Sequence, residues 1–508
     1  MSSSLLFVFV IGYFLLLLAV AWRTSRNSNN DSFFIGNRNS NWMLVAFGMI
    51  GTSLSGITFV SVPGTVGDFA GEGHKAFSYL QVIIGYWIGY LVIAFVLLPL
   101  YYRLHLTSIY NYLSSRFGPV AYRTGALFFI ISRTVGATAR LYVVINVLHI
   151  FILRDMGIPF GLTSLVILLM ILLYTFEGGV KTIVYTDTLQ TTFMLLGLVV
   201  CTVYILRHLH FPAGGALHAM GDGGFTSIFN TDVLSRGFFG KQIIGGMFIA
   251  IAMTGLDQEM MQKNISVKNL GDSKKNVVTF SFIMVLVSFL FLLLGGLLYL
   301  YALDKGAVYQ GHTLVLGGKN VIGDDLFPTL ALHYLPQSVS IIFIIALISA
   351  LFPSADGALT ALTSSFCIDM LNIKNKGLSE KQLRRTRMTV HGSFAVLFLI
   401  CILVFKWVDN KSIINVILDL AGYTYGPLLG LFAFGIFTKR LLPNTWKITA
   451  LCLLAPVACY FLSEYSARWF GGFQIGIELL VVNGLLTFLG LWGLSRAESR
   501  SAVGYVAD

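Results

Sequence analysis

Charged side chains are scarce in this chain of 508 residues, in which Asp, Glu, Lys and Arg together make up 11%. A soluble chain of this size carries about 25%. Hydrophobic residues account for 56%, and the mean hydropathy is +0.80. Because so little charge cannot cover a water-facing surface, we predict that most of the chain faces lipid or other apolar helices.

Motifs for ATP use and for metal or disulfide chemistry are also missing. The sequence has no GxxxxGK[ST] loop, so ATP is not expected as an energy source, and its nine histidines form no HExxH motif. The cysteines lie in apolar stretches without the spacing of a zinc site or a disulfide framework. We therefore expect neither an enzyme nor a resident cofactor. The cysteines, which we interpret as core residues, are Cys201, Cys367, Cys401, Cys452 and Cys459.

Thirteen apolar stretches are long enough to cross about 30 Å of hydrocarbon. No cleavage site follows the first, so we expect it to be retained as a helix. No extramembrane domain is expected, and we predict one all-α transmembrane domain over residues 1–508. The stretches lie near residues 4–22, 41–66, 77–101, 122–152, 160–176, 182–206, 241–259, 277–304, 336–372, 388–406, 412–437, 446–464 and 474–494.

Basic residues concentrate in every second gap between these stretches. One set of alternate gaps, starting with the gap after the first stretch, holds twenty-two Lys and Arg when the C-terminal tail is counted with it. The other gaps hold ten. Positive residues favour the cytoplasmic side, so we predict the N-terminus outside and the C-terminus inside. Topology thus explains the net charge of +11 better than nucleic-acid binding does. The longest outer gaps, 207–240 and 305–335, are lids or simple connectors.

Two stretches contain residues that interrupt helices. The second carries small polar residues at 51–58, and the ninth carries a proline and a carboxylate within 349–357. Small residues equally serve close helix packing, but an intramembrane Asp is costly and usually functional. We predict that both spans break where they line a cavity. Hard cations prefer oxygen ligands, so we expect an alkali-ion site where the two spans meet.

The spans also repeat. The second and seventh are each followed by four spans of similar length in opposite orientation, as in transporters built from inverted repeats. The seventh has break points of its own at residues 245–246 and 254–255. The approximate repeat core covers residues 41–259 and 241–437, with a leading helix at 4–22 and two extra helices over 446–494.

Three further ionisable residues lie at membrane depth: Asp187, Arg133 and Arg140. Asp187 either serves a site or reaches the inner surface. The two arginines are seven residues apart, so about one helical face carries both. Either arginine could pair with a carboxylate as structural glue. Arg133 is also suited to anchor an anionic solute, because its planar fork matches a carboxylate.

Several segments together resemble the sodium:solute symporter family over nearly the whole chain. They are the small-residue run of the second span and residues 174–181, 185–190, 254–258, 262–263, 354–356 and 358–365. This resemblance implies the leucine-transporter-type five-plus-five inverted repeat with flanking helices. It also implies Na⁺-driven import by alternating access.

The resemblance further implies a sodium site between the second and ninth spans. Its ligands would be main-chain oxygens of Gly51 and Leu54, together with oxygens of Ala350, Pro353 and Ser354. A serine is usual where this chain has Pro353, so one hydroxyl ligand is missing, and the charge of Asp356 could compensate. In some members, an acidic residue matched here by Asp187 binds a second sodium ion. A second site at Asp187 and Asp356 is therefore an open hypothesis.

The solute pocket implied by the resemblance lies beside the broken second span. The sugar-carrying branch has acid and amide side chains where this chain has Ile57 and Thr58, which argues against a neutral hexose. The pocket-lining residues of this chain are similar to those of the sialic-acid-carrying branch. They favour a carboxylate-bearing solute of the sialic-acid or monocarboxylate type. The lining residues would be Ser53, Ser55, Thr58, Phe77, Gln81 and Arg133.

We therefore predict a multi-pass protein of the cell (inner) membrane that imports a small organic solute together with Na⁺. Its expected partners are the solute, Na⁺ and the lipid bilayer, with no obligate protein partner. The alternatives are a proton-coupled symporter, suggested by Pro353 and the two intramembrane Asp residues, and a Na⁺-coupled sugar or amino-acid symporter. A channel is disfavoured because no filter motif repeats, and a solute sensor because no signalling domain is present.

Overall fold

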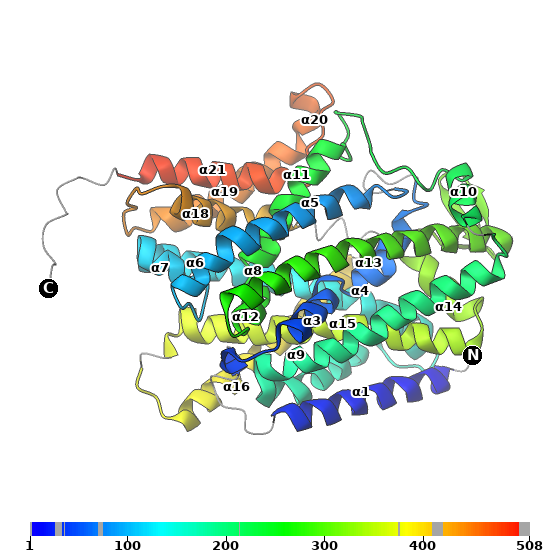
Figure 1. Cartoon of the computed structure of the whole chain (residues 1–508), viewed down its shortest axis with the longest axis horizontal. Helices are drawn as coiled ribbons and strands as arrows, with labels where there is room; N and C mark the ends of the chain where they lie inside the picture. The colour runs from blue at the N-terminus through cyan, green and yellow to red at the C-terminus, as the bar shows by residue number, and fades with distance from the viewer. Residues whose placement is uncertain are drawn as a thin grey trace, which may run out of the picture.

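The computed structural model describes residues 3–25, 33–34, 36–69, 75–212, 214–373, 376–408 and 420–496. Figure 1 shows long helices running roughly side by side, with α1 (Ser3–Ser25) beginning at one end of the bundle and α21 (Leu479–Leu494) ending at the other. The remaining elements are η1 (Gly36–Arg38), α3 (Trp42–Ser53), α4 (Gly56–Thr65), α5 (Tyr79–Val92), η2 (Ile93–Leu97), α6 (Leu98–Arg103), α7 (Asn111–Phe117), α8 (Pro119–Leu148), η3 (His149–Leu153), α9 (Phe160–His208), α10 (Gly215–Asp222), α11 (Phe239–Ala250), η4 (Ile251–Gly255), α12 (Gln258–Ile265), α13 (Leu270–Asp304), β1 (Val308–Gln310), β2 (Thr313–Leu316), β3 (Lys319–Asn320), η5 (Gly323–Asp325), α14 (Leu326–His333), α15 (Gln337–Ser365), η6 (Phe366–Met370), α16 (Glu380–Val408), α18 (Gly426–Phe437), α19 (Lys447–Glu464) and α20 (Ser466–Trp469).

Length and apolar composition identify the helices that cross the bilayer. Eight helices of the described residues are long and apolar enough, and two bent helix pairs raise the number to ten. Shorter apolar helices lie at Phe160–Phe176, Gly426–Phe437 and Leu479–Leu494. The chain is therefore an all-α, multi-pass membrane protein. The first residues of the predicted stretch 412–437, up to 419, lie outside the described residues.

A glycine separates the fifth and sixth predicted stretches within α9. Gly179 has φ 51° and ψ −147°, whereas the residues on either side are helical. A side chain at this position would overlap Phe33, and this left-handed region favours glycine. Gly179 therefore turns the chain between residues 160–176 and 182–206, as the two stretches require.

Glycines also bring α5 and α11 into backbone contact. A Cβ added at Gly246 would lie 2.5 Å from the Val82 carbonyl oxygen, and one at Gly85 would lie 2.8 Å from the Met247 amide nitrogen. Small residues at such interfaces let helices approach closely inside a bilayer, where lipid removes the hydrophobic drive for association. This contact joins the second helix of the first predicted repeat to the first helix of the second predicted repeat.

The outer gap 305–335 caps the end of α4 that lies away from the helix break. It contains the antiparallel sheet β1-β2-β3, η5 and α14. The Tyr309 hydroxyl donates to the Gly67 carbonyl at 3.3 Å, and Phe327 packs on Phe59 with ring centroids 5.3 Å apart. Of the two interpretations offered by the sequence, the structure favours a cap over a passive connector.

The predicted break at residues 349–357 is wrong. α15 runs as one helix through Pro353, with every residue from Ala346 to Ser365 buried. Proline removes one N–H and releases one carbonyl, and tight packing from neighbouring helices lets membrane helices tolerate this loss. The second interruption lies instead in the seventh stretch. There the helix ending at Gly255 and the helix starting at Gln258 meet at an angle of 64°.

Candidate functional site

The second predicted span is broken at the centre of the bundle. α3 ends at Ser53, α4 begins at Gly56, and the two axes are bent by 55°. Between them, Leu54 has φ −90° and ψ 67°, and Ser55 is extended with φ −65° and ψ 177°. The last carbonyls of α3 lack helical partners and carry the negative end of its dipole, whereas the first amides of α4 carry the positive end. The break thus offers oxygens to a cation and amides to an anion.

The structure brings the predicted sodium ligands together across α3, α4 and α15. A Cβ at Gly51 would lie 3.6 Å from Pro353 Cγ, and one at Gly56 would lie 3.8 Å from the Ala350 carbonyl oxygen. The Gly51 amide donates to Thr191 Oγ1 of α9 at 3.1 Å, which fixes the α3 terminus. The predicted set is almost completely buried: Gly51, Leu54, Ala350, Pro353 and Ser354.

Oxygen atoms on α15 remain available in this region despite its unbroken helix. Pro353 has no N–H, so the carbonyl of Ser349 four residues earlier lacks its helical donor. The Ser354 hydroxyl donates to the Leu351 carbonyl at 3.0 Å, so its oxygen lone pairs are still free to accept. Proline thus removes one hydroxyl from the expected ligand set and releases one main-chain oxygen nearby.

A second helix break positions acidic residues beside the first. Asp257 caps α12, accepting from the amides of Glu259 at 2.9 Å and Met260 at 3.2 Å. Its other carboxylate oxygen accepts from the Tyr425 hydroxyl at 3.1 Å. The break in α11–α12 therefore directs a carboxylate into the bundle centre, where a cap and a tyrosine hold it.

Arg133 of α8 is already paired with these acids. Its guanidinium contacts Glu259 directly, and its Nη1 lies 3.8 Å from Asp257 Oδ2. All three side chains are buried. Of the two roles left open for Arg133, this geometry supports structural pairing, and a solute carboxylate would have to share the guanidinium with Glu259.

Asp187 of α9 is held by a lysine. Lys263 Nζ donates to Asp187 Oδ2 and to Thr52 Oγ1, both at 2.7 Å, and lies 3.5 Å from Glu259 Oε1. Asp187 is fully buried, so it does not reach the inner surface. Its Oδ1 has no hydrogen-bond partner among the described residues, which leaves one carboxylate oxygen available.

Asp356 is also buried, but it lacks a nearby cation such as the ones that contact Asp187 and Asp257. Its Oδ2 accepts from the Tyr174 hydroxyl at 2.8 Å, and its Oδ1 accepts from the Gly357 amide. No Lys, Arg or His nitrogen of the described residues lies within 4.0 Å of it. Gln190 is fully buried three residues after Asp187 on α9, and neither of its amide atoms has a hydrogen-bond partner there. Buried polar atoms are normally hydrogen-bonded, so the free oxygen of Asp187 and the Gln190 amide can accept a further partner.

The central cluster has an unbalanced formal charge. Counted by formal charge, it combines four carboxylates with three cations, which leaves one carboxylate without a matching cation. The members are Asp187, Asp257, Glu259 and Asp356 on one side and Arg133, Arg140 and Lys263 on the other. Buried charge is costly unless paired, so one additional monovalent cation or proton suits this cluster.

The predicted solute-lining residues do not gather in one cavity. A cavity of about 60 Å³ beside the break is lined by Ser53, Arg133 and Arg140, and it holds about two water molecules. Gln81 instead accepts from the Asn230 amide at 3.3 Å, and the Phe77 amide donates to the Ser227 carbonyl, so both contact the loop before α11. Ser55 and Thr58 are buried on the α4 side of the break. A solute pocket needs further opening of this conformation.

Sequence reasoning overlooked the acidic and basic residues of α12. It assigned Lys263 to a loop and gave no role to Asp257, Glu259 or Tyr425. The segment after residues 254–255 carried the signal that could have found them. Asp257 is a strong helix N-cap there, and Glu259 and Lys263 are four residues apart, which suits an ion pair on one helical face.

Comparisons with known proteins agree with this geometry. The model of the sodium:solute symporter family matches residues 33–444. The chain is 24% identical over 497 residues to the sodium/sialic acid symporter SiaT of Proteus mirabilis, covering 93% of this chain and 92% of that protein. It is 24% identical over 462 residues to the sodium/glucose cotransporter 1 of Oryctolagus cuniculus, and the match covers 85% of this chain and 68% of that protein. A solved substrate-bound, outward-open state of a Na⁺-coupled sialic acid symporter shares the fold, with TM-score 0.78, 19% identity and 96% of each chain covered.

Proposed function

The chain belongs to the sodium:solute symporter family, and on this premise we propose that it uses Na⁺ entry to import a carboxylate-bearing solute of the sialic-acid type. It is a Na⁺-coupled solute symporter and not an enzyme. The observation that carries the proposal is the broken pair α3–α4 pressed against α15, with Gly51 at Pro353 and Gly56 at the Ala350 carbonyl.

We propose that the first sodium ion binds between the end of α3 and α15. Its ligands are main-chain oxygens of Gly51 and Leu54 with oxygens of Ala350, Pro353 and Ser354. The dipole at the C-terminus of α3 favours a cation there. Binding would hold α3–α4 against α15, and it can shift the conformational equilibrium only by its differential affinity for the two states.

A second ion is proposed at Asp356, with Asp187 Oδ1 and the Gln190 amide oxygen as further ligands. The proposal is supported by the uncompensated negative charge of the cluster and by the unpartnered atoms of Asp187 and Gln190. No cofactor other than the coupling ion is proposed.

The solute carboxylate is proposed to bind at the break, near Ser53 at the end of α3 and near Ser55 and Thr58 on the α4 side. The relatives described as sialic acid symporters support this solute class. Arg133 contributes if the outward-open state loosens its contact with Glu259, and Phe77 and Gln81 line the outer part of the route. For each elementary charge that moves inward, a membrane potential of 100 mV adds about 2.3 kcal/mol to the free energy available for import.

Thirteen spans in one transmembrane domain over residues 1–508 are proposed, with the N-terminus outside and the C-terminus inside. The eight long helices, the two bent pairs and the three shorter apolar helices of the described residues correspond one by one to the predicted stretches. The proposed location is the cell (inner) membrane, supported by bacterial relatives.

Proton coupling is the second candidate function, because Asp356 has no cation within 4.0 Å among the described residues. The purified protein in liposomes separates the two. Uptake of radiolabelled sialic acid is measured under an inward Na⁺ gradient without a pH gradient, and under a pH gradient without Na⁺. Uptake only with Na⁺ is expected, and pyruvate, glucose and an amino acid serve as parallel solutes. Uptake driven by the pH gradient alone would show that the coupling ion is the proton and not Na⁺.

A further inference from the structure

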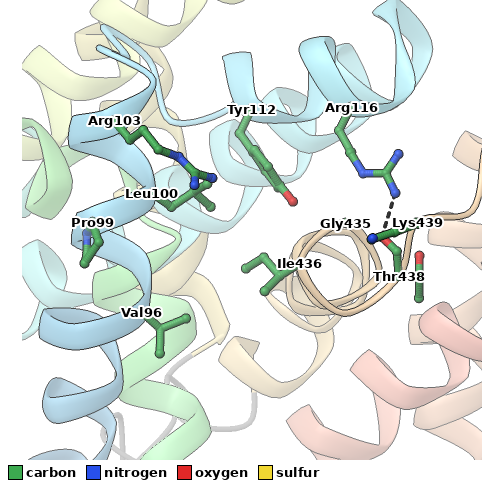
Figure 2. A pocket seen from close by; sticks show the side chains of 10 residues that line it. All are labelled: Val96, Pro99, Leu100, Arg103, Tyr112, Arg116, Gly435, Ile436, Thr438 and Lys439. Carbon is green, nitrogen blue, oxygen red and sulfur yellow. Dashed lines mark hydrogen bonds between the residues drawn. The ribbon is translucent and has the colours of Figure 1, made fainter. Parts of the chain in front are cut away.

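A cavity apart from the central cluster lies at one end of the bundle. It measures about 650 Å³ and is lined by η2, α6, α7 and the end of α18. Figure 2 shows Arg103 on one wall of this cavity and Arg116 and Lys439 on the opposite wall, with Tyr112 and Ile436 between them. A phospholipid head group with its glycerol backbone fits within this volume, which lies in the usual range of ligand pockets.

Positive charge dominates one end of this cavity. Its lining includes Arg103, Arg116 and Lys439 and no acidic residue. No carboxylate of the described residues lies within 4.0 Å of any of these three cations. Arg116 donates to the Thr438 carbonyl at 2.6 Å, so its guanidinium is oriented by the end of α18 and not left free to move. Three uncompensated cations in one hollow call for an anion.

The opposite end of the cavity is apolar and opens toward lipid. Val96 and Pro99 lie away from the two arginines in Figure 2, and Ile436 lies between the two walls. Val96 is 44% exposed, and neighbouring Phe95 and Phe437 are 60% and 78% exposed. Apolar side chains this exposed on membrane-crossing helices contact acyl chains. The cavity therefore pairs a cationic end with a lipid-facing end, as an anionic phospholipid requires.

The cavity lies where inner-leaflet head groups would be. In Figure 1, α6 and α7 lie at the same end of the bundle as the end of α21, opposite the start of α1. The proposed orientation makes this the cytoplasmic end, where anionic lipids and basic pockets between transmembrane helices meet. The cavity shares no lining residue with the small cavity at the helix break, so the two are distinct.

We propose that this cavity binds the head group of an anionic inner-leaflet phospholipid, which lies between Arg103 on one wall and Arg116 and Lys439 on the other, with an acyl chain along Val96 and Ile436. The lipid would join α6 and α7 to the end of α18. The inference rests on the proposed orientation only for the choice of leaflet.

The test uses the full-length protein purified in a mild detergent. Dioleoyl-phosphatidylglycerol is titrated in, and bound lipid is counted by native mass spectrometry. The variant Arg103→Ala/Lys439→Ala removes two exposed cations and leaves the Arg116–Thr438 contact intact. The matched control Lys268→Ala/Lys275→Ala removes two exposed cations from the same end of the bundle but outside the cavity. Dioleoyl-phosphatidylcholine and inorganic phosphate are the parallel probes.

The cavity variant is expected to bind phosphatidylglycerol about 30-fold more weakly, at about fivefold per basic residue, while the control binds as the unaltered protein does. Equal weakening in both variants would overturn the assignment, because it would indicate diffuse surface charge. Equal binding of phosphatidylcholine would remove the requirement for an anionic lipid. Displacement of the lipid by millimolar inorganic phosphate would make the occupant a soluble anion. None of these readouts depends on transport, so they stand apart from the test of the proposed function.

Discussion

Lys263 and Asp187 are joined inside the bundle by a hydrogen bond of 2.7 Å between Nζ and Oδ2, and both side chains are almost completely buried. The same ammonium donates to Thr52 of α3. One cation therefore connects α3 and α9, which belong to the first predicted repeat, with α12 of the second. Each charge compensates the other in a region that water does not reach.

Removing one partner of this pair is expected to be costly. Lys263→Met leaves Asp187 buried without its cation, which typically destabilises a protein by about 3–5 kcal/mol. The unfolding midpoint of the purified protein should therefore fall clearly. Lys275→Met, at a position whose side chain is 67% exposed, is the control and should leave the midpoint almost unchanged.

The double variant Lys263→Met/Asp187→Asn removes both charges and should recover most of the lost stability. If it is no more stable than Lys263→Met, the loss comes from packing and not from the unpaired carboxylate.

Pro353 should set the sodium affinity. Pro353→Ser restores a hydroxyl beside Gly51, so the Na⁺ concentration for half-maximal uptake should fall by about fivefold to tenfold, as expected for about 1 kcal/mol from one added oxygen ligand. Ser354→Ala should raise it by a similar factor. Uptake by proteoliposomes across a series of Na⁺ concentrations measures both. A half-saturating concentration that neither change moves would place the ion elsewhere.

Asp356 should distinguish one coupling ion from two. Asp356→Asn removes the uncompensated charge, so the number of Na⁺ ions moved per solute should fall by one if a second ion binds there. The measurement is the solute gradient at which net flux stops for a set Na⁺ gradient and membrane potential. Asp272→Asn, at the start of α13 and far from the cluster, is the control. An unchanged ratio would leave Asp356 outside ion coupling.

Gly179 should be essential for folding. Gly179→Ala puts a side chain into a left-handed backbone and onto Phe33, so the yield of folded protein and its unfolding midpoint should both drop. Gly136→Ala is the matched control, because a Cβ at that helical position meets nothing within 4 Å. It should be neutral or slightly stabilising. Equal behaviour of the two variants would contradict the assigned turn in α9.

The sequence predicted the breaks at residues 51–58 and 254–255 correctly, and those at residues 245–246 and 349–357 incorrectly. At residues 51–58, small polar residues follow one another and the helix breaks at Leu54 and Ser55. At Pro353 the chain contains the strongest local breaker, yet α15 continues. Local propensity determines whether a helix breaks only where tertiary packing is weak. Pro353 is buried among neighbouring helices, so their packing keeps α15 continuous.

Hydrophobic run length, basic residues in alternate gaps and the family motifs were enough to indicate a multi-pass symporter, and the sodium site predicted at Gly51, Ala350 and Ser354 stays a prediction. These features are local or repeat along the chain, so they can be recognised without coordinates. The tertiary structure alone decided that Arg133 pairs with Glu259, that Lys263 lies between Thr52 and Asp187, and that Gln81 contacts a loop instead of the cavity. Such pairings depend on which helical faces meet between residues that lie 76 to 211 positions apart in the chain, and packing of the whole bundle determines those faces.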